Sequence, residues 1–260
     1  MTELNTTGRK VALITGAGTG VGAATALMLA QKGYNILVNY SRSETEARQS
    51  EAACRAAGAD TLLIKGDVSD MADCTALAAA AAARWGRIDV LVNNAGISNF
   101  AGVANWDALD MDIFQRIYAV NTVGTFQMVK ACVQHLKAAR GCIVNVSSMA
   151  GISGVGSSVP YIMSKGALNT LTLHLAKQLA PEIRVNAVCP GLITSRWFVD
   201  GVGQENFEKI RATSEAMAPL QTASSPEDVA DAIVWLVTGA RTVTGDLLKI
   251  DAGVHLGPRR

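Results

Sequence analysis

The sequence has no excess of either charge. Among its 260 residues, 23 basic side chains oppose 22 acidic ones, the formal net charge is +1, and no block of like charge occurs. Proteins that bind nucleic acid or anionic membranes usually carry a basic patch. We therefore expect neither nucleic acid nor a membrane among the partners of this chain.

The chain also lacks a cysteine framework, a metal motif and long hydrophobic runs. Five cysteines are scattered without a C-x-x-C pair, and three histidines share no ligand spacing. Such cysteines are typical of buried thiols in a reducing compartment. The alanine-rich run at 76–84 is too short to span a membrane, and the polar start MTELNTTGRK resembles no signal peptide. We expect a cytoplasmic protein without a metal site.

The sequence does contain a regular alternation of short apolar segments and longer helical ones. Hydrophobic residues make up 49% of the chain. The strand-like segments are 10–15, 35–40, 61–65, 88–94, 141–148, 183–190 and 246–251. The helical segments are 20–32, 44–57, 71–85, 107–138, 160–180 and 226–238.

This alternation predicts one α/β domain over residues 1–260. Continuous apolar strands are typical of parallel sheets buried on both faces. We expect a Rossmann-type, doubly wound, mainly parallel seven-stranded sheet with helices on both faces. Residues 191–225 break the rhythm as one long irregular stretch, and long loops of this kind often form lids.

A glycine-rich turn, TGAGTGVG, follows the first predicted strand and precedes a helix. Its spacing is Gly16-x-x-x-Gly20-x-Gly22, so it departs from the G-x-G-x-x-G fingerprint. By themselves the glycines are consistent with a structural turn. Placed between strand and helix, they favour a site where backbone N–H groups and the helix N-terminus bind a pyrophosphate.

Several other short motifs appear in a particular order. They are NNAG at 93–96, Asn121 within AVNTVG, VSS at 146–148, Tyr161 with Lys165, PGLIT at 190–194, and TGDLLKIDAG near the end. Together with the glycine turn, these motifs resemble the short-chain dehydrogenase/reductase family over nearly the whole chain. That resemblance implies a nicotinamide cofactor and an oxidoreductase that interconverts a ketone and a secondary alcohol.

The resemblance assigns a set of cofactor-binding residues. In it, the Asp67 carboxylate meets the adenine amino group, although this side chain is also suited to capping a helix, and the Val68 backbone bonds the ring. Asn94 and Gly96 fix the end of the fourth strand against the cofactor. The full set is Gly16, Thr19, Gly20, Val21, Gly22, Tyr40, Ser41, Arg42, Asp67, Val68, Asn94, Ala95, Gly96, Tyr161, Lys165, Pro190, Gly191, Ile193 and Thr194.

The end of the second strand favours NADP(H) over NAD(H). An acid commonly holds the ribose hydroxyls at this place, whereas an arginine accommodates a 2′-phosphate. Here Tyr40 occupies the acid's place, and Arg42 follows with a fork suited to phosphate oxygens. Thr19 stands where many NADP-preferring relatives have a second basic residue, so NAD(H) stays open.

Four residues are predicted to carry the catalysis. Tyr161 and Lys165 are four apart, which places both on one face of a helix, and the ammonium is expected to lower the phenol's pKa. Tyr161 is then the general acid/base. Ser148, thirteen residues before the tyrosine as in the family, would hold the substrate oxygen, with Ser147 as its neighbour. By resemblance, Asn121 would position a water beneath Lys165.

The substrate is the least determined part of the sequence. Candidate pocket residues are Ser98, Met149, Ile152, Trp197 and Phe198, with Phe100, Ser153 and Met217 nearby. These mostly apolar side chains suit a carbonyl compound or alcohol with a hydrophobic body, although several are also suited to packing the lid. Arg196 and Arg211 are isolated in the sequence, which argues against a phosphopantetheine site.

Other functions stay open beside the ketone/alcohol oxidoreductase. They are a 3-oxoacyl-thioester reductase, an enoyl reductase, a sugar epimerase and a non-catalytic dinucleotide sensor. The family's enoyl branch usually spaces its tyrosine and lysine farther apart, and epimerases usually have a larger C-terminal domain. Sensors typically lack the tyrosine or the lysine. The resemblance also implies a homotetramer, with helices around 107–138 and 160–180 pairing between subunits.

Overall fold

The computed structural model describes residues 8–100 and 105–257. Residues 1–7, within the polar start, and residues 258–260 of the predicted 1–260 domain therefore lie outside the described residues. The described chain forms a seven-stranded sheet in the order β3-β2-β1-β4-β5-β6-β7, and every pairing is parallel. The strands are β1 Val11–Ile14, β2 Asn35–Tyr40, β3 Thr61–Lys65, β4 Val90–Asn93, β5 Cys142–Val146, β6 Arg184–Pro190 and β7 Leu247–Ile250.

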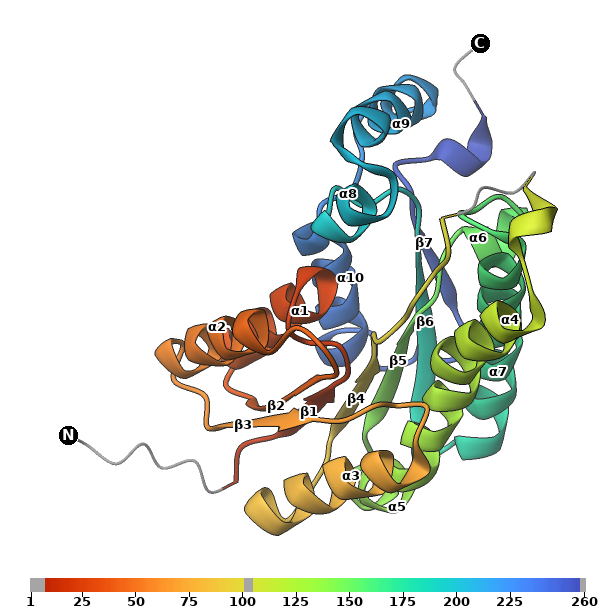
Figure 1. Cartoon of the computed structure of the whole chain (residues 1–260). Coiled ribbons are helices and arrows are strands. Elements are labelled where there is room, and N and C mark those ends of the chain that lie inside the picture. Colours follow the sequence, from red (N-terminus) through yellow and green to blue (C-terminus); the bar gives the residue numbers. More distant parts are fainter. Residues whose placement is uncertain (1–7, 101–104, 258–260) are drawn as a thin grey trace.

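Helices cover both faces of this sheet (Figure 1). On one face lie α1 Gly20–Gln31, α2 Glu44–Ala56 and α10 Pro226–Thr238; on the other lie α3 Met71–Trp85, α4 Met111–Tyr118, α5 Thr125–Ala139 and α7 Val159–Leu179. The predicted Rossmann-type, doubly wound architecture is confirmed, and each predicted strand and helical segment has its counterpart.

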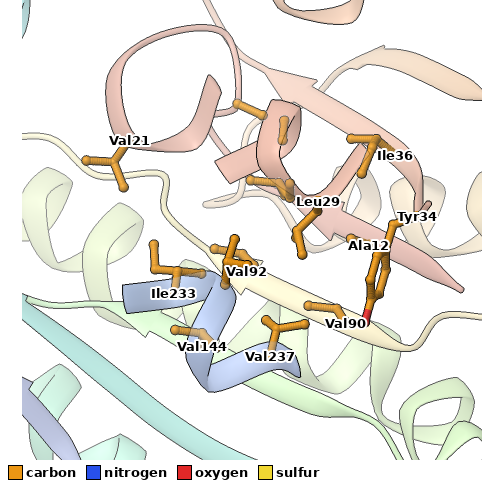
Figure 2. Close-up of a cluster of buried hydrophobic side chains, with 14 of the residues drawn as sticks. Ala12, Val21, Leu29, Tyr34, Ile36, Val90, Val92, Val144, Ile233 and Val237 are labelled. Carbon is orange, nitrogen blue, oxygen red and sulfur yellow. The ribbon is translucent and has the colours of Figure 1, made fainter. Parts of the chain in front are cut away.

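Alternate strand residues enter two separate cores. Ala12 and Ile14 pack in the cluster beneath α1 and α10, while Leu13 between them packs in the cluster beneath α3, α5 and α7. Figure 2 shows the first cluster, with Leu29 from α1 and Ile233 from α10 beside the strand residues. Because successive side chains of a strand point to opposite faces, both faces must be apolar, and this explains the continuous apolar runs.

Local sequence signals fix several helix starts. Asp70 caps α3 by accepting a hydrogen bond from the Ala72 N–H, at 2.7 Å. Ser225 and Asp228 form a reciprocal capping box on α10, with Pro226 in its first turn. Caps of this kind satisfy backbone donors that have no partner within the helix. They explain why α3 and α10 begin where the sequence predicts.

The prediction of one helix over 107–138 is wrong in detail. A 3-10 turn, η1 Trp106–Ala108, comes first, and a π-helical turn, η2 Ala119–Gly124, separates α4 from α5. The Thr125 hydroxyl donates to the Asn121 carbonyl at 3.1 Å, and the Thr122 hydroxyl donates to the Ser164 carbonyl at 3.0 Å. These hydroxyl groups add side-chain bonds at the wide turn. Insertions of this kind are frequent at functional sites.

The segment 191–225 is not wholly irregular, as the sequence suggested. It contains α8 Arg196–Val202 and α9 Gln204–Met217, which lie together at one end of the molecule (Figure 1). Ion pairs between neighbouring turns of α9 join Lys209 to Glu205 at 2.7 Å and Arg211 to Glu208 at 2.8 Å. Such pairs stabilise a helix with few buried residues. We call residues 191–225 the lid. In the described part of the chain, no helix is long and apolar enough to cross a membrane.

Candidate active site

The sheet brings the ends of β1 and β4 together at its topological switch point. β1 pairs with β2 on one side and with β4 on the other. In open α/β sheets, ligands bind in the crevice outside the carboxyl ends of strands at such a point. A pocket of about 880 Å³ lies there, lined by the glycine turn, the ends of β2, β4, β5 and β6, α7 and the lid. Its size suits a cofactor with a small substrate.

The glycine turn forms a tightly packed floor for this pocket. Gly16 and Gly20 have φ angles of +61° and +54°, which side chains rarely tolerate. The Asn94 amide donates to the carbonyls of Thr15 and Gly16, at 3.0 and 2.9 Å. A Cβ at Gly22 would collide with the Gly16 carbonyl oxygen and with Asn94. The turn therefore stays close to β4, and its backbone faces the pocket where a pyrophosphate would lie.

Asn39 is a site residue that the sequence reading missed. Its Oδ1 accepts from the Gly16 N–H at 3.3 Å, and its Nδ2 donates to the Gly66 carbonyl at 3.0 Å. It lines the pocket and ties the glycine turn to the end of β3. A polar side chain inside the apolar run NILVNY was the available signal.

Most residues of the predicted cofactor set line the pocket. The exceptions are Gly22, whose missing side chain lets the turn close, and Thr194, whose N–H and hydroxyl both turn to the Ser224 carbonyl, at 2.9 and 3.4 Å. The residues that do line it are Gly16, Thr19, Gly20, Val21, Tyr40, Ser41, Arg42, Asp67, Val68, Asn94, Ala95, Gly96, Tyr161, Lys165, Pro190, Gly191 and Ile193.

Tyr40 and Arg42, at the end of β2, both line the pocket. The position after Asn39 is occupied by Tyr40, which has no carboxylate. Its side chain is 8% exposed and contributes to the core. Arg42 is exposed on the pocket wall and makes no ion pair within the described residues. Its guanidinium can therefore pair with a phosphate without first breaking an ion pair to a described carboxylate.

Asp67 lies on the pocket wall and does not cap α3. Its Oδ1 accepts from the N–H and hydroxyl of Ser69, at 2.9 and 2.7 Å. Asp70 fills the capping role instead. The loop thus holds the Asp67 carboxylate at the pocket, and its contact with an adenine stays a prediction.

Tyr161 and Lys165 lie on one face of α7, as their spacing predicts, and both line the pocket. The Lys165 Nζ is 5.6 Å from the centre of the Tyr161 ring and donates to the Val146 carbonyl at 2.8 Å. Burial lowers the pKa of Lys165 to about 8. An ammonium is costly to bury without an anionic partner.

The pKa of Tyr161 differs from the sequence-based prediction. Burial raises it to about 12, while a hydrogen bond with the Ser148 side chain lowers it. Lys165 is not among the causes of this shift, so the predicted lowering of the phenol's pKa by the ammonium is not found, and loss of solvent dominates. At neutral pH Tyr161 holds its proton, which suits an acid that protonates an alkoxide.

The two serines at the end of β5 point in different directions. The Ser147 hydroxyl donates to Asn169 Oδ1 at 2.6 Å and is buried away from solvent. The Ser148 hydroxyl accepts from the Ala150 N–H at 3.1 Å and bonds Tyr161. The geometry therefore places Ser148 with Tyr161 as predicted, and Ser147 holds β5 against α7.

Asn121 is fully buried in the π turn and does not line the pocket. Its Oδ1 accepts from the Ile97 N–H at 2.8 Å, and its Nδ2 donates to the Ile97 carbonyl and the Ser164 hydroxyl. A Cβ on Gly96 would lie 3.4 Å from Asn121 Oδ1 and 3.6 Å from Lys165 Nζ. Gly96 therefore lies next to both the Asn121 amide and the Lys165 ammonium.

The substrate side of the pocket differs in part from the prediction. Met149, Phe100, Trp197 and Phe198 line it, and the Ser98 hydroxyl bonds that of the pocket residue Ser157 at 2.5 Å. Ser98, Ile152, Ser153 and Met217 are not among the residues that line the pocket, so the structure does not place them where the sequence predicts. Ile152 and Met217 are 42% and 46% exposed, because α6 Ala150–Ser153 and the end of α9 turn these side chains outward.

Aromatic rings gather between the lid and Tyr161. The ring centres of Phe100 and Trp197 are 4.9 Å apart, and those of Trp197 and Phe198 are 5.2 Å apart, both edge to face. Trp197 lies 6.1 Å from the Tyr161 ring. Edge-to-face contacts are favourable for aromatic pairs. The aromatic cluster, Phe100, Trp197 and Phe198, thus joins the lid to the catalytic helix.

The two lid arginines, isolated from other basic residues in the sequence, each pair with acidic side chains in the structure. Arg196 pairs with Glu46 of α2 at 2.8 Å and with Asp200 at 3.3 Å. Arg211 pairs with Glu208 at 2.8 Å. The Arg196–Glu46 pair ties the lid to the cofactor side of the pocket across 150 positions of sequence.

Among the described residues, no group of three or more His, Cys, Asp or Glu side chains is arranged so that it could bind a metal ion. All five cysteines are free and buried. By contrast, the glycine floor, Asn94 and the exposed Arg42 fit a dinucleotide in charge and shape. The pocket is thus suited to an organic cofactor.

Comparison with known proteins gives consistent results. The family profile described as "Enoyl-(Acyl carrier protein) reductase" matches residues 16–255. The chain is 39% identical to "Granaticin polyketide synthase putative ketoacyl reductase 2" of Streptomyces violaceoruber, over 95% of this chain and 96% of that protein. It is 34% identical to "L-rhamnose 1-dehydrogenase (NAD(P)(+))" of a Sphingomonas species, over 95% and 96%.

A solved structure agrees with the sequence comparisons. The crystal structure of a "putative short-chain dehydrogenase/reductase" from Burkholderia xenovorans superposes with a TM-score of 0.89 and 38% identity, covering 96% of this chain and 100% of that one. At this identity the likeness extends beyond the fold to related sequence. Reductases and a dehydrogenase thus occur among the relatives, on chemically different substrates.

Proposed function

The chain belongs to the short-chain dehydrogenase/reductase family, and from that premise we propose that it interconverts a ketone and a secondary alcohol with NADP(H) in preference to NAD(H). The observation that carries the proposal is the meeting of Tyr161, Ser148 and Lys165 at the pocket outside β4 and β5. Each of the three has a distinct part in moving a proton at a carbonyl oxygen.

The proposed division of labour follows from these contacts. The cofactor supplies or accepts the hydride at the carbonyl carbon. Ser148 holds the substrate oxygen, and Tyr161 donates its proton to that oxygen as the alkoxide forms. An alkoxide is a stronger base than a phenolate, so transfer of the proton to it is favourable even from a phenol with a pKa of about 12. Oxidation of an alcohol needs the phenolate and should therefore increase with pH.

Lys165 and Asn121 act around this proton transfer. Lys165 lies beside the tyrosine ring and offers donors for a ribose hydroxyl, which would anchor the cofactor. Asn121 is held by Ile97 and Ser164 and is separated from the lysine only by Gly96. We propose that Asn121 positions a water through which Tyr161 regains its proton.

The preference for NADP(H) is supported by Arg42, which forms no ion pair with any described residue, and by the absence of a carboxylate at position 40. A guanidinium binds a phosphate through charge-assisted hydrogen bonds. NAD(H) stays the second cofactor because no basic side chain stands at position 19. Direct titration of the protein with NADPH and NADH measures the preference, and equal or tighter binding of NADH would contradict it.

A 3-oxoacyl-thioester reductase is the second candidate. The name of the relative from Streptomyces violaceoruber, a ketoacyl reductase, favours it. Against it, both arginines of the lid are paired with acids and not free to hold a phosphopantetheine. Assaying an acetoacetyl thioester beside simple ketones separates the two. The description of the matching family profile names an enoyl substrate. Analysis of the reaction product would show whether a C=C bond is reduced instead of a C=O bond.

We also propose a homotetramer in the cytoplasm. Exposed apolar side chains on the central helices, Phe126 on α5 and Leu173 and Met163 on α7, support pairing of these helices between subunits. Five free, buried cysteines suit a reducing compartment. Light scattering coupled to size exclusion measures the mass of the assembly, and a monomer would contradict the first of these proposals.

The direct test of the proposed function is Tyr161→Phe. We expect turnover of ketones to decrease by at least about 100-fold, since the proton donor is lost, with unchanged affinity for NADPH. Tyr34→Phe is the matched control, because Tyr34 is also buried, with a pKa of about 12, but lies in the core outside the pocket. Near-normal turnover in Tyr161→Phe would refute the assignment. No turnover by the wild type across ketones, alcohols and thioesters would favour a dinucleotide sensor.

A further inference from the structure

Aromatic residues are scarce in this chain, yet four of them meet at one place. They make up 5% of the sequence, with four Trp, four Tyr and five Phe. Phe100, Tyr161, Trp197 and Phe198 all line the single pocket described above. Aliphatic side chains also give a lid apolar packing, but only rings add the edge-to-face contacts seen here. The pocket wall is therefore aromatic at this place and not merely apolar.

The position of these rings relative to Tyr161 limits what they contact. A carbonyl oxygen that receives the Tyr161 proton lies within hydrogen-bond reach of its hydroxyl. The Trp197 ring centre is only 6.1 Å from the Tyr161 ring centre. Trp197 therefore lies next to the tyrosine that meets the carbonyl, which favours contact with a part of the substrate close to the carbonyl over contact with a distant tail.

The aromatic cluster is also incompletely covered by the protein itself. Trp197 is 39% exposed although it contacts three other rings. Its neighbours approach edge to face, with interplanar angles of 65° to Phe100 and 85° to Phe198. Aromatic rings gain additional attraction from another ring in an offset or edge-to-face arrangement, beyond the area that they bury.

From these observations, and resting on the proposed function, we propose that the substrate is an aryl ketone or the corresponding aryl carbinol. Its aromatic ring is attached to or fused beside the carbonyl and packs against Trp197 and Phe100. Trp197 is the specificity-determining residue of this contact. The reaction itself balances as above: the cofactor's hydride goes to the carbonyl carbon and the Tyr161 proton goes to its oxygen.

A pair of ketones with one carbon skeleton tests this proposal. 1-Tetralone and 1-decalone share a fused bicyclic skeleton and a carbonyl, but only tetralone carries a benzene ring. Their intrinsic reactivities differ, so the measured quantity is the change in the ratio of their kcat/KM values on mutation. We expect Trp197→Leu to lower the tetralone/decalone ratio by about 3- to 10-fold, the magnitude of one aromatic pair.

Trp235→Leu is the matched control. Trp235 lies on α10 with 48% exposure and does not line the pocket. It should leave the ratio unchanged. If Trp197→Leu lowers both kcat/KM values equally, or neither, the residue only packs the lid and the proposal is overturned.

A binding measurement separates this proposal from the proposed function. Calorimetric titration of cofactor-loaded Tyr161→Phe with each ketone requires no turnover. Tighter binding of tetralone than of decalone, lost on adding Trp197→Leu, supports the aromatic site even if the wild type fails to reduce ketones. Equal binding of the two ketones contradicts the aromatic site while leaving ketone reduction intact.

Discussion

The two halves of the pocket are built in different ways. The cofactor half is held by amide hydrogen bonds that are buried or partly buried: Asn94 bonds Thr15 and Gly16, and Asn39 bonds the glycine turn and Gly66. The substrate half is formed by the lid, where half-exposed rings pack together and Arg196 bonds Glu46 at the surface.

This difference indicates which half tolerates change. A buried hydrogen bond that loses one partner leaves a polar group without solvent, which is costly. Contacts among partly exposed rings and surface ion pairs contribute less and can be exchanged more freely. We infer that the fold fixes the cofactor and the proton donor, while the lid determines the substrate.

The sharpest test of the fixed half is Lys165→Met. We expect turnover to decrease by about 100- to 10,000-fold, since the side chain that orients Tyr161 and the cofactor is lost. We also expect the protein without cofactor to become more stable at neutral pH, by about 1–2 kcal/mol, because a buried ammonium is removed. Steady-state kinetics and urea unfolding measure the two effects.

The sign of this stability gain follows from the pKa of Lys165. Its value of about 8 in the folded protein lies below 10.5, the ordinary value. Between these pH values the unfolded chain binds more protons, so the free energy of unfolding of the wild type increases with pH. The gain in Lys165→Met should therefore be largest below pH 8 and shrink toward pH 10.5. Lys177→Met, at an exposed site on the same helix, should show no such trend; a pH-independent gain would contradict the account.

Gly22→Ala tests the packing of the glycine turn. Its Cβ would overlap the Gly16 carbonyl oxygen and Asn94, neither of which is a flexible side-chain end free to move away. We expect the free energy of unfolding to decrease by about 3 kcal/mol. In Gly166→Ala, also in a helix, the new Cβ meets only the Gly151 carbonyl at 3.8 Å. That control should be neutral or stabilised by up to about 1 kcal/mol. Equal stability of the two variants would show that the turn is not tightly packed.

Arg42→Ala concerns the rim of the cofactor half. Losing charge-assisted bonds to a phosphate should weaken NADPH binding by about 5- to 30-fold and leave NADH binding unchanged. Fluorescence titration with each cofactor measures both constants. Arg48→Ala is the control, because Arg48 pairs with Glu44 and does not line the pocket. A parallel loss for both cofactors would mean that Arg42 does not distinguish them.

Glu46→Gln probes the link between the halves and should have the smallest effect. It removes the ion pair that joins α2 to the lid at Arg196. Exposed pairs contribute little, so we expect kcat/KM to change by about two- to threefold, less at high salt. Glu44→Gln, whose partner Arg48 is on the same helix, should leave kcat/KM unchanged. A tenfold or larger loss in Glu46→Gln would show that the lid is held mainly by this pair.

The sequence predicts the cofactor half much better than the substrate half. Strand and helix patterns are local, and the motif positions place Tyr161, Lys165 and Ser148 at one end of the sheet. The pairing of Arg196 with Glu46 depends on folding across 150 positions, and nothing local indicates it. The π turn around Asn121 likewise depends on contacts with Ile97 and Ser164.

The pKa of Tyr161 shows why spacing alone is insufficient. The four-residue interval correctly predicts that the phenol and the ammonium share a face of α7. It contains no information on burial, which raises the pKa of the phenol to about 12 and lowers that of the ammonium to about 8. Burial is a property of the packed chain, so the interval predicts the partners and not their proton affinities.

The most direct test of the central claim follows an isotope from cofactor to product. NADPH carrying deuterium at C4 of the nicotinamide, on the transferred face, is incubated with the protein and an aryl ketone, and the alcohol is examined by mass spectrometry and NMR. The account predicts deuterium on the carbinol carbon with the wild type and almost no alcohol with Tyr161→Phe. Alcohol without deuterium at that carbon, or equal yields from the two proteins, would contradict it.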